Sequence, residues 1–286
     1  MSLSRALLYV GIFCAGFVVV SLWSFWLVIR PPRIFIGHTP REFRLAAEDV
    51  TLTADDGTRL AAWFIPETKI QIQKRAVIFL HGYPAEKSDM LGIATAFQPE
   101  FALFLMDLRY FGKSQGRYTT LGLKEWNDAM KAVDFLKVRG YERIGIFGFS
   151  LGGATALLAA EQDPRLGAAA TYAAYSDLRT LGHETYKSLF VLKYPLVRLM
   201  EFWARILWGA WVADVSPVKA AQKIAIPVFL IHSRHDEQIS FAHAERLRQA
   251  LAQNQRAELY IIEEGLHGEL PPDFNIRLKE FFEKNL

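Results

Sequence analysis

The chain begins with a continuous apolar run and then changes to short apolar stretches separated by amphipathic ones. The run covers residues 6–29 and contains no charged residue. At about 1.5 Å per residue, a helix of this length can cross the roughly 30 Å hydrocarbon core of a bilayer. Trp23 and Trp26 stand near its C-terminal end, where interfacial aromatic side chains are typical. The pattern predicts a single transmembrane helix.

Residues 1–33 are therefore expected to form an N-terminal membrane anchor. A cleaved signal peptide is the alternative, but the run is long for one and no small-x-small cleavage site follows it. Arg5 precedes the run, while Arg30 and Arg33 follow it. Because positive charge is nearly balanced across the segment, it does not show on which side of the membrane the rest of the chain lies.

Residues 34–286 are predicted to form one α/β domain. Residues 48–66 alternate apolar and polar positions around Asp56-Gly57, which is typical of a β-hairpin. Ser240 is the expected N-cap of a later helix. Further strands are predicted at 76–82, 101–107, 143–149, 166–175, 227–233 and 257–263, with helices at 123–140, 151–160, 240–253 and 274–285. Strands that alternate with helices predict a mostly parallel central sheet flanked by helices.

One segment interrupts this alternation. Between Asp177 and Pro217 no strand is predicted, and aromatic and apolar residues are frequent. We expect a helical cap insertion over residues 177–217. Its aromatic side chains favour core packing, and the alternative is that they line an acyl pocket or touch the bilayer surface. They are Phe202, Trp203, Trp208 and Trp211.

Two serines, Ser114 and Ser150, stand in a G-x-S-x-G pattern. A nucleophile elbow requires a buried strand, a tight turn and a helix that starts at once. Residues 143–149 and 151–160 supply this context to Ser150, whereas Ser114 leads into a polar loop. Ser150 is therefore the predicted nucleophile, and the match at 112–116 is interpreted as a loop.

A serine hydroxyl needs a base, and the base needs an acid that orients it. Asp236 and His267 each come directly after a predicted strand. Together with Ser150 they follow the order Ser, Asp, His, and the carboxyl ends of parallel strands meet at one edge of a sheet. The predicted catalytic residues are Ser150, Asp236 and His267, with Asp177 as the alternative acid.

Other titratable side chains receive other roles. His232 is expected to be structural, and His243, inside a predicted helix, to lie at the surface. His235 is too close to Asp236 in sequence to approach it from across the sheet, and Glu237 is its direct neighbour. His81 and Asp107 are expected to order the loops that they begin.

An oxyanion hole requires two converging N–H donors. The backbone of Leu151, the residue after the nucleophile, is expected to supply one. The loop after residues 76–82 is expected to supply the other, and Tyr83 is the choice because Pro84 has no N–H.

Composition narrows the function without identifying it. The 286 residues carry a net charge of +3, with basic and acidic residues interspersed, which argues against a nucleic-acid partner. The single cysteine, Cys14, excludes an intramolecular disulfide and a cysteine metal site. No metal-ligand spacing is present, so no metal or organic cofactor is expected.

The stretches LHGYP, MDLRYFGKSQG, GFSLGG, IHSRHDEQI and EGLHGE together resemble the α/β-hydrolase superfamily. The likeness covers Glu48 to the C-terminus and is greatest to acyl-hydrolase and serine-aminopeptidase-like branches, some of which carry an N-terminal anchor. Two departures are Tyr83-Pro84, where members often have a second Gly or a small residue, and Ser233, where members often have Gly.

The resemblance implies an α/β-hydrolase fold and a serine hydrolase that uses a Ser-His-Asp triad and an acyl-enzyme intermediate without a cofactor. The anchor and the aromatic cap favour a small-molecule acyl or lipid-like carboxylic ester as substrate. Two alternatives remain open: an amidase or peptidase that uses the same triad, and a non-catalytic hydrolase-like binding module on the membrane. The natural substrate and the oligomeric state are left open.

Overall fold

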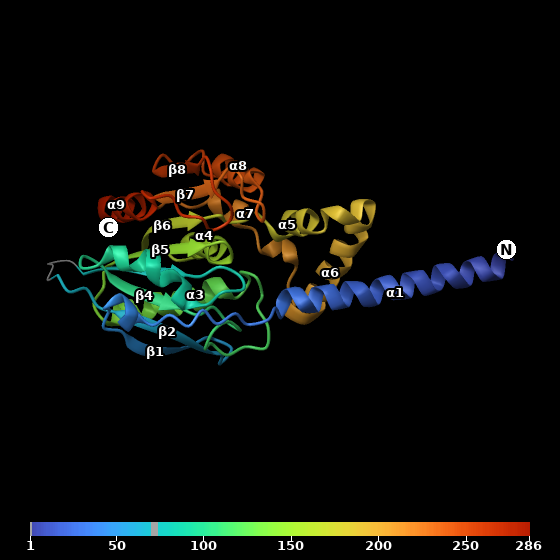
Figure 1. The fold of residues 1–286 in the computed structure, drawn as a ribbon, viewed down its shortest axis with the longest axis horizontal. Coiled ribbons are helices and arrows are strands. Elements are labelled where there is room, and N and C mark those ends of the chain that lie inside the picture. The colour runs from blue at the N-terminus through green and yellow to red at the C-terminus, as the bar shows by residue number, and fades with distance from the viewer. Residues whose placement is uncertain (1, 70–73) are drawn as a thin grey trace.

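The computed structural model describes residues 2–69 and 74–286, and an eight-stranded sheet forms its centre (Figure 1). The strands are β1 (Glu48–Thr53), β2 (Arg59–Ile65), β3 (Arg75–Leu80), β4 (Ala102–Met106), β5 (Arg143–Phe149), β6 (Leu166–Tyr172), β7 (Val228–Ser233) and β8 (Ala257–Ile262). Their spatial order is β1-β2-β4-β3-β5-β6-β7-β8.

The sheet is mostly parallel, as predicted. β1 and β2 form an antiparallel hairpin whose turn contains Gly57 at φ +80°, and β2 pairs antiparallel with β4. The remaining neighbours, from β4 through β3 to β8, are all parallel. The carboxyl ends of six strands therefore meet at one edge of the sheet, where such sheets build their sites.

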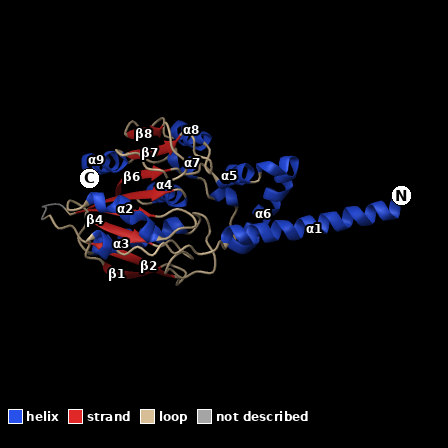
Figure 2. Ribbon diagram, in the orientation of Figure 1, coloured by secondary structure: helices blue, strands red, loops and turns tan. Residues whose placement is uncertain are grey.

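Helices cover both faces of the sheet, as Figure 2 shows. Side chains of α3 (Glu125–Val138), α4 (Leu151–Gln162) and α8 (Phe241–Ala250) share one buried cluster. Side chains of α2 (Leu91–Ala94) and α9 (Phe274–Asn285) share the other. The further helices are α1 (Leu3–Ile29), α5 (Leu178–Thr185), α6 (Lys193–Trp208) and α7 (Pro217–Ala221), with short 3₁₀ helices at Pro40–Phe43, Lys87–Met90, Thr95–Phe97, Lys187–Leu192 and Val212–Asp214.

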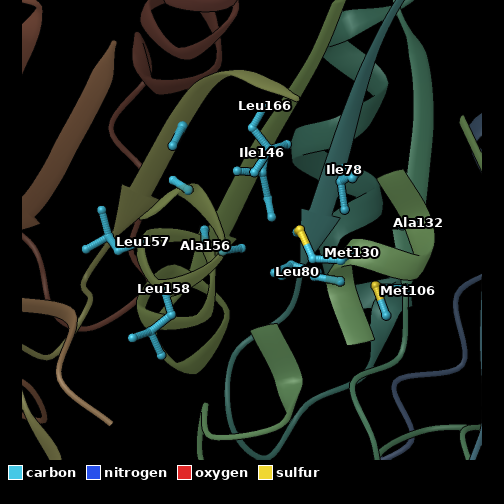
Figure 3. Packing of buried hydrophobic residues seen from close by; sticks show 14 of the residues in the cluster. Ile78, Leu80, Met106, Met130, Ala132, Ile146, Ala156, Leu157, Leu158 and Leu166 are labelled. Atoms are coloured by element: carbon cyan, nitrogen blue, oxygen red, sulfur yellow. The ribbon is translucent and has the colours of Figure 1, made fainter. Parts of the chain in front are cut away.

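Successive side chains of each central strand enter opposite clusters, as the two-residue period of a strand requires. In β3, Ile78 and Leu80 belong to the cluster under α3 and α4, and Val77 and Phe79 belong to the one under α2 and α9. All four are fully buried. Figure 3 shows the first cluster, where Met130 of α3 meets strand residues of the sheet. A strand buried on both faces explains why its sequence is continuously apolar.

Helix α4 lies unusually close to the strands beneath it. A Cβ added at Gly148 would stand 2.0 Å from the Gly152 carbonyl oxygen, and one at Gly152 would stand 2.3 Å from the Leu80 oxygen. Only glycine fits at either position. This contact sets the position of the turn between β5 and α4.

The apolar helix α1 has 27 residues and is long and apolar enough to cross a membrane, properties that a signal sequence near the N-terminus would share. It projects away from the sheet in Figure 1. Its last turns are fixed to the rest of the chain. The Val28 carbonyl accepts from the Tyr83 hydroxyl at 3.0 Å, and the Ile29 carbonyl accepts from the Thr119 N–H at 3.0 Å.

The segment between β6 and β7 contains helices α5, α6 and α7 and packs on the end of α1. The Trp203 indole N–H donates to Ser21 Oγ at 3.0 Å, and the Trp208 ring lies 5.8 Å from the Phe25 ring. Phe202 and Trp211, by contrast, are both 48% exposed. The expected aromatic packing thus holds for two of the four side chains, and its partner is the apolar N-terminal helix.

One strand boundary was predicted wrongly. β6 ends at Tyr172 and not at residue 175, because Ala173 adopts φ 55° and turns the chain out of the sheet. Ser240 is the N-cap residue of α8, as predicted, but its side chain accepts no capping hydrogen bond, and its buried hydroxyl has no hydrogen-bond partner within the described residues.

We expect Gly148→Ala to lower the free energy of unfolding by about 3 kcal/mol, the upper end of typical overpacking, because the clashing atom belongs to the backbone. The thermal midpoint of the detergent-solubilised chain should fall by about 6 °C or more. Gly92→Ala in α2 is the control, since a Cβ there meets nothing within 4 Å. Equal midpoints for the two variants would contradict the close packing of α4.

Candidate active site

Ser150 occupies the sharp turn between β5 and α4. Its backbone has φ 53° and ψ −113°, a conformation that non-glycine residues rarely adopt. The turn is held by two hydrogen bonds, from the Ser150 N–H to the Tyr172 carbonyl at 2.8 Å and from the Ala154 N–H to the Ser150 carbonyl at 3.0 Å. Strained backbone of this kind is concentrated at functional sites. The turn places the serine at the carboxyl edge of the sheet.

Several backbone N–H groups near Ser150 have no acceptor within the residues that the structure describes. Among them are those of Leu151, the first residue of α4, and Tyr83, in the loop after β3. Both residues line the same cavity as Ser150. Unpaired N–H groups at a helix N-terminus favour negative charge, which applies to Leu151; Tyr83 lies in a loop, and the oxyanion role of both residues stays a prediction.

His267 and Asp236 meet across the loops that follow β8 and β7. The His267 Nδ1 lies 2.7 Å from Asp236 Oδ2, with both side chains almost completely buried. A carboxylate accepts, so the Nδ1 carries the proton and the Nε2 is left as an acceptor. The His267 ring lies against the Phe149 ring, with centroids 4.9 Å apart. Because Phe149 directly precedes Ser150, this contact brings the imidazole to the nucleophile turn.

In this conformation the structure records no hydrogen bond between the Ser150 hydroxyl and the His267 imidazole among its described residues. Catalytic contacts are often long before substrate binds and tighten in the complex.

Asp236 is held as an anion. Burial alone would raise its pKa, but the hydrogen bond from His267 and the N–H groups of Ile239 and Gln238 outweigh this and lower the pKa below its usual value. The two N–H groups donate to Oδ1 at 2.7 and 2.9 Å. The other carboxylate oxygen is thereby left for the imidazole.

Several side chains that hold the His267 loop carry no signal in the sequence. Glu237 Oε2 accepts from the His267 N–H at 2.9 Å, and the Tyr172 hydroxyl donates to the Glu269 carbonyl at 2.7 Å. The Ser233 hydroxyl donates to the Gly265 carbonyl. Ser233 is one of the two departures from the family pattern, and this bond ties the β7 loop to the β8 loop.

A cavity of about 850 Å³ lies over the carboxyl edge of the sheet. Ser150, Leu151 and Asp236 form part of its floor, and most of its remaining wall is apolar. That wall contains Val28 from α1, Tyr83, Leu121, Tyr175, Leu178 and Leu181. None of the four aromatic residues considered for an acyl pocket lines this cavity. Trp208 lines a smaller apolar cavity that shares Val28 and Leu121 with it.

Comparison with known proteins agrees with this architecture. The model of the prolyl oligopeptidase family matches residues 113–283. The chain belongs to the prolyl oligopeptidase family. It is 31% identical to the protein YfhR of Escherichia coli O157:H7 over 78% of this chain and 74% of YfhR. It is 27% identical to the α/β-hydrolase domain-containing protein WAV2 of Arabidopsis thaliana, over 90% and 85% of the two chains.

Solved structures give the same fold. The esterase Pf2001 of Pyrococcus furiosus superposes with a TM-score of 0.72 at 24% identity, covering 89% of this chain and 98% of the esterase. The acylaminoacyl peptidase of Pyrococcus horikoshii superposes with a TM-score of 0.65 at 20% identity, covering 85% and 42%. This prolyl oligopeptidase family member is therefore an α/β-hydrolase superfamily protein and a hydrolase of the α/β class.

The second G-x-S-x-G serine has a structural place in this family member. Ser114 is 1% exposed; its hydroxyl accepts from the Ala61 N–H at 2.8 Å and donates to the Asp107 carbonyl at 2.7 Å. Asp107 accepts from the Lys87 ammonium at 2.6 Å, and this ion pair is buried. Asp107 thus orders its loop, as expected.

Two further histidines, His81 and His232, and the alternative acid are engaged elsewhere. The His81 Nε2 accepts from the Leu108 N–H at 3.0 Å, and His232 contacts the Ile239 carbonyl at 2.8 Å. Asp177 caps α5 by accepting from the Thr180 N–H at 2.8 Å. His81 and His232 are completely buried, and burial lowers the pKa of each.

His243 was wrongly expected at the surface. It is fully buried, because α8 packs it against the chain that leaves β6. Its Nδ1 accepts from the Ser176 N–H at 2.9 Å, and its Nε2 lies 3.2 Å from Glu184 Oε2. Although Glu184 is near, the His243 Nε2 has no hydrogen-bond partner within the part of the chain that the structure describes.

A metal ion has no evident site here. Within residues 2–69 and 74–286, no group of three or more histidine, cysteine, aspartate or glutamate side chains could hold one.

We expect Asp107→Asn to cost about 3–5 kcal/mol of stability, because it leaves the buried Lys87 ammonium without a carboxylate. The thermal midpoint should fall by roughly 10 °C. Adding Lys87→Met should restore part of the loss. Glu48→Gln, which breaks an exposed pair with Arg139, should cost no more than about 1 kcal/mol. If Asp107→Asn is as mild as this control, the buried pair is not what orders the loop.

Proposed function

We propose that this chain is a membrane-anchored serine hydrolase that cleaves carboxylic esters of acyl or lipid-like substrates. Residues 1–33 would be an uncleaved single-pass anchor, and residues 34–286 a catalytic domain with residues 177–217 as a helical cap. The observation that carries the proposal is the 2.7 Å hydrogen bond between His267 and Asp236, beside a serine in a strained turn over the same cavity.

The chemistry follows from these positions. The Ser150 hydroxyl attacks the ester carbonyl while the His267 Nε2 takes its proton. Asp236 keeps the imidazole in the required tautomer and stabilises the imidazolium. The N–H groups of Leu151 and Tyr83 bind the oxyanion. His267 then returns the proton to the leaving alcohol, and water activated by the same imidazole releases the acid from the acyl-enzyme.

The apolar cavity wall supports an acyl chain as the bound group, since such pockets recognise apolar substrates through contact area. A second candidate is an amidase or peptidase with the same triad. It is favoured by the prolyl oligopeptidase family match and by the likeness to the acylaminoacyl peptidase. Rates on p-nitrophenyl esters of increasing chain length and on aminoacyl p-nitroanilides separate the two.

A fluorophosphonate probe should label the wild-type chain covalently and leave Ser150→Ala unlabelled. Ser114→Ala is the matched control. It removes a G-x-S-x-G hydroxyl and two hydrogen bonds, so it should lose roughly 1–2 kcal/mol of stability yet keep its labelling per folded molecule. Labelling of Ser150→Ala at the wild-type rate would rule out the assigned nucleophile.

Asp236→Asn should lower kcat by about 10⁴-fold, because the amide no longer fixes the imidazole tautomer. Asp177→Asn should leave kcat unchanged, since asparagine caps a helix about as well as aspartate. Both are measured by ester hydrolysis at saturating substrate. If Asp177→Asn gave the large loss and Asp236→Asn the small one, the alternative acid would be correct.

A further inference from the structure

The chain exposes an apolar tip, residues 189–192, far from the central sheet. The tip belongs to the 3₁₀ segment Lys187–Leu192 between α5 and α6. Phe190 is 80% exposed and Val191 is 74% exposed, and Leu189 and Leu192 are exposed as well. Phe190 also has φ 48° and ψ −119°, a strained conformation for an aromatic residue. Four consecutive exposed apolar side chains are unusual on a soluble surface.

The outer face of α6 adds further exposed apolar side chains to this surface. Tyr194, Phe202 and Ile206 are exposed on one side of the helix, and Arg198 and Arg205 stand among them. The opposite side carries Val197 and Ala204, which are buried. The Tyr194 ring contacts His183 and the Phe202 ring contacts Trp203, yet Tyr194 and Phe202 both remain about half exposed.

The apolar helix α1 packs on the side of α6 opposite this surface. Trp203 of α6 is hydrogen-bonded to Ser21, and Trp208 packs on Phe25. In Figure 1, α5 and the start of α6 project from the sheet in the same direction as α1. Trp23 and Trp26 on this part of α1 are exposed, as expected for side chains at the membrane interface. The exposed apolar side chains of α1 and those of the tip and α6 therefore belong to elements that pack together and extend from the sheet in one direction.

Charge on this segment fits an anionic lipid surface. Between residues 187 and 208 there are four basic residues, Lys187, Lys193, Arg198 and Arg205, and one acidic residue, Glu201. Glu201 is buried, and its carboxylate already accepts from Arg179 and Arg198. Basic side chains around an exposed apolar face are typical of segments that lie in the bilayer interface.

We propose that the apolar tip and the outer face of α6 insert into the bilayer surface next to α1, and that the cavity takes its acyl ester from that bilayer. The claim that the cavity takes its ester from the bilayer rests on the proposed function. The cavity wall supports it, because Val28 comes from α1 while Leu181, Thr185 and Lys187 come from the segment that carries the tip. Both membrane-contacting elements thus border the space above Ser150.

Insertion of the tip into the bilayer can be measured without an assay of enzyme activity. Cys14 is the chain's only cysteine, so Cys14→Ser combined with Phe190→Cys allows a nitrobenzoxadiazole fluorophore to be placed at the tip. The full chain is reconstituted in phosphatidylcholine–phosphatidylglycerol vesicles that contain phosphatidylcholine with a nitroxide on its acyl chain. The fluorophore at position 190 should be quenched nearly as strongly as one on Cys14 of the otherwise unchanged chain.

Val138→Cys in the Cys14→Ser background is the negative control. Val138 is 89% exposed at the C-terminal end of α3, and the chain continues from there to the start of β5, at the sheet edge opposite Ser150. Its fluorophore should not be quenched. Quenching at position 190 no stronger than at position 138 would overturn insertion, and would leave a second protein as the occupant of the tip. An unquenched Cys14 fluorophore would refute the anchor itself.

The substrate route is tested with Phe190→Asp and Val191→Asp combined. Because aspartate is strongly disfavoured in the bilayer, this variant should hydrolyse a vesicle-embedded long-chain p-nitrophenyl ester roughly tenfold more slowly. Soluble p-nitrophenyl acetate should be cleaved at the wild-type rate, since neither residue lines the cavity. Val138→Asp, equally exposed but distant, should match wild type on both esters.

The outcomes separate the two proposals. A wild-type chain that cleaves neither ester would refute the proposed function, while the quenching measurement would still decide insertion. A double variant with wild-type rates on both esters would refute delivery from the bilayer. Equal losses of rate on both esters would mean that the tip acts through the fold of the cavity and not through lipid. That result would also refute delivery of the ester from the bilayer.

Discussion

The close approach of α4 to the ends of β3 and β5 is the constraint on which the site depends. Glycines at positions 148 and 152 remove the two Cβ atoms that would otherwise collide with backbone. The helix can then begin immediately after the strand, which forces Ser150 into its strained turn and places Ser150 and Leu151 in the cavity lining. Strain at one residue is tolerated because two buried layers of the sheet hold both ends of the turn.

The proposed base and acid, His267 and Asp236, have a second, independent support. Loops after β7 and β8 are joined by hydrogen bonds that involve Ser233, Glu237 and the His267 N–H. The aromatic rings of Phe149 and Tyr172 connect this pair of loops to the nucleophile strand and its neighbour. The imidazole is thereby positioned from both sides. A rigid histidine of fixed tautomer reduces the reorganisation that the chemical step requires.

A feature of the fold or the site could be predicted from the sequence when residues close together in the chain determine it. The strands, the sheet type and the turn at Ser150 follow from short apolar runs and from glycine spacing, which adjacent residues determine. The burial of His243 depends on a contact between α8 and the chain after β6, and the packing of Trp203 depends on α1, about 180 residues away in sequence. No local pattern encodes such contacts. The catalytic roles of Ser150, Asp236 and His267 stay predictions, although the structure contains the hydrogen bond that joins the last two.

The position of α1 links these features to the proposed membrane anchor. A helix that only tethers a domain could be joined to it by a free linker, but here its last turn is part of the cavity wall through Val28, and Tyr83 hydrogen-bonds to that residue's carbonyl. Tyr83 is also one of the two proposed oxyanion donors, and it occupies a site where family members often have a small residue. A single side chain thus connects the end of the apolar helix to the loop beside the nucleophile. If α1 spans a bilayer, any change in its tilt would act on the cavity through this contact, so the orientation of the protein at the membrane and the shape of its site are physically coupled.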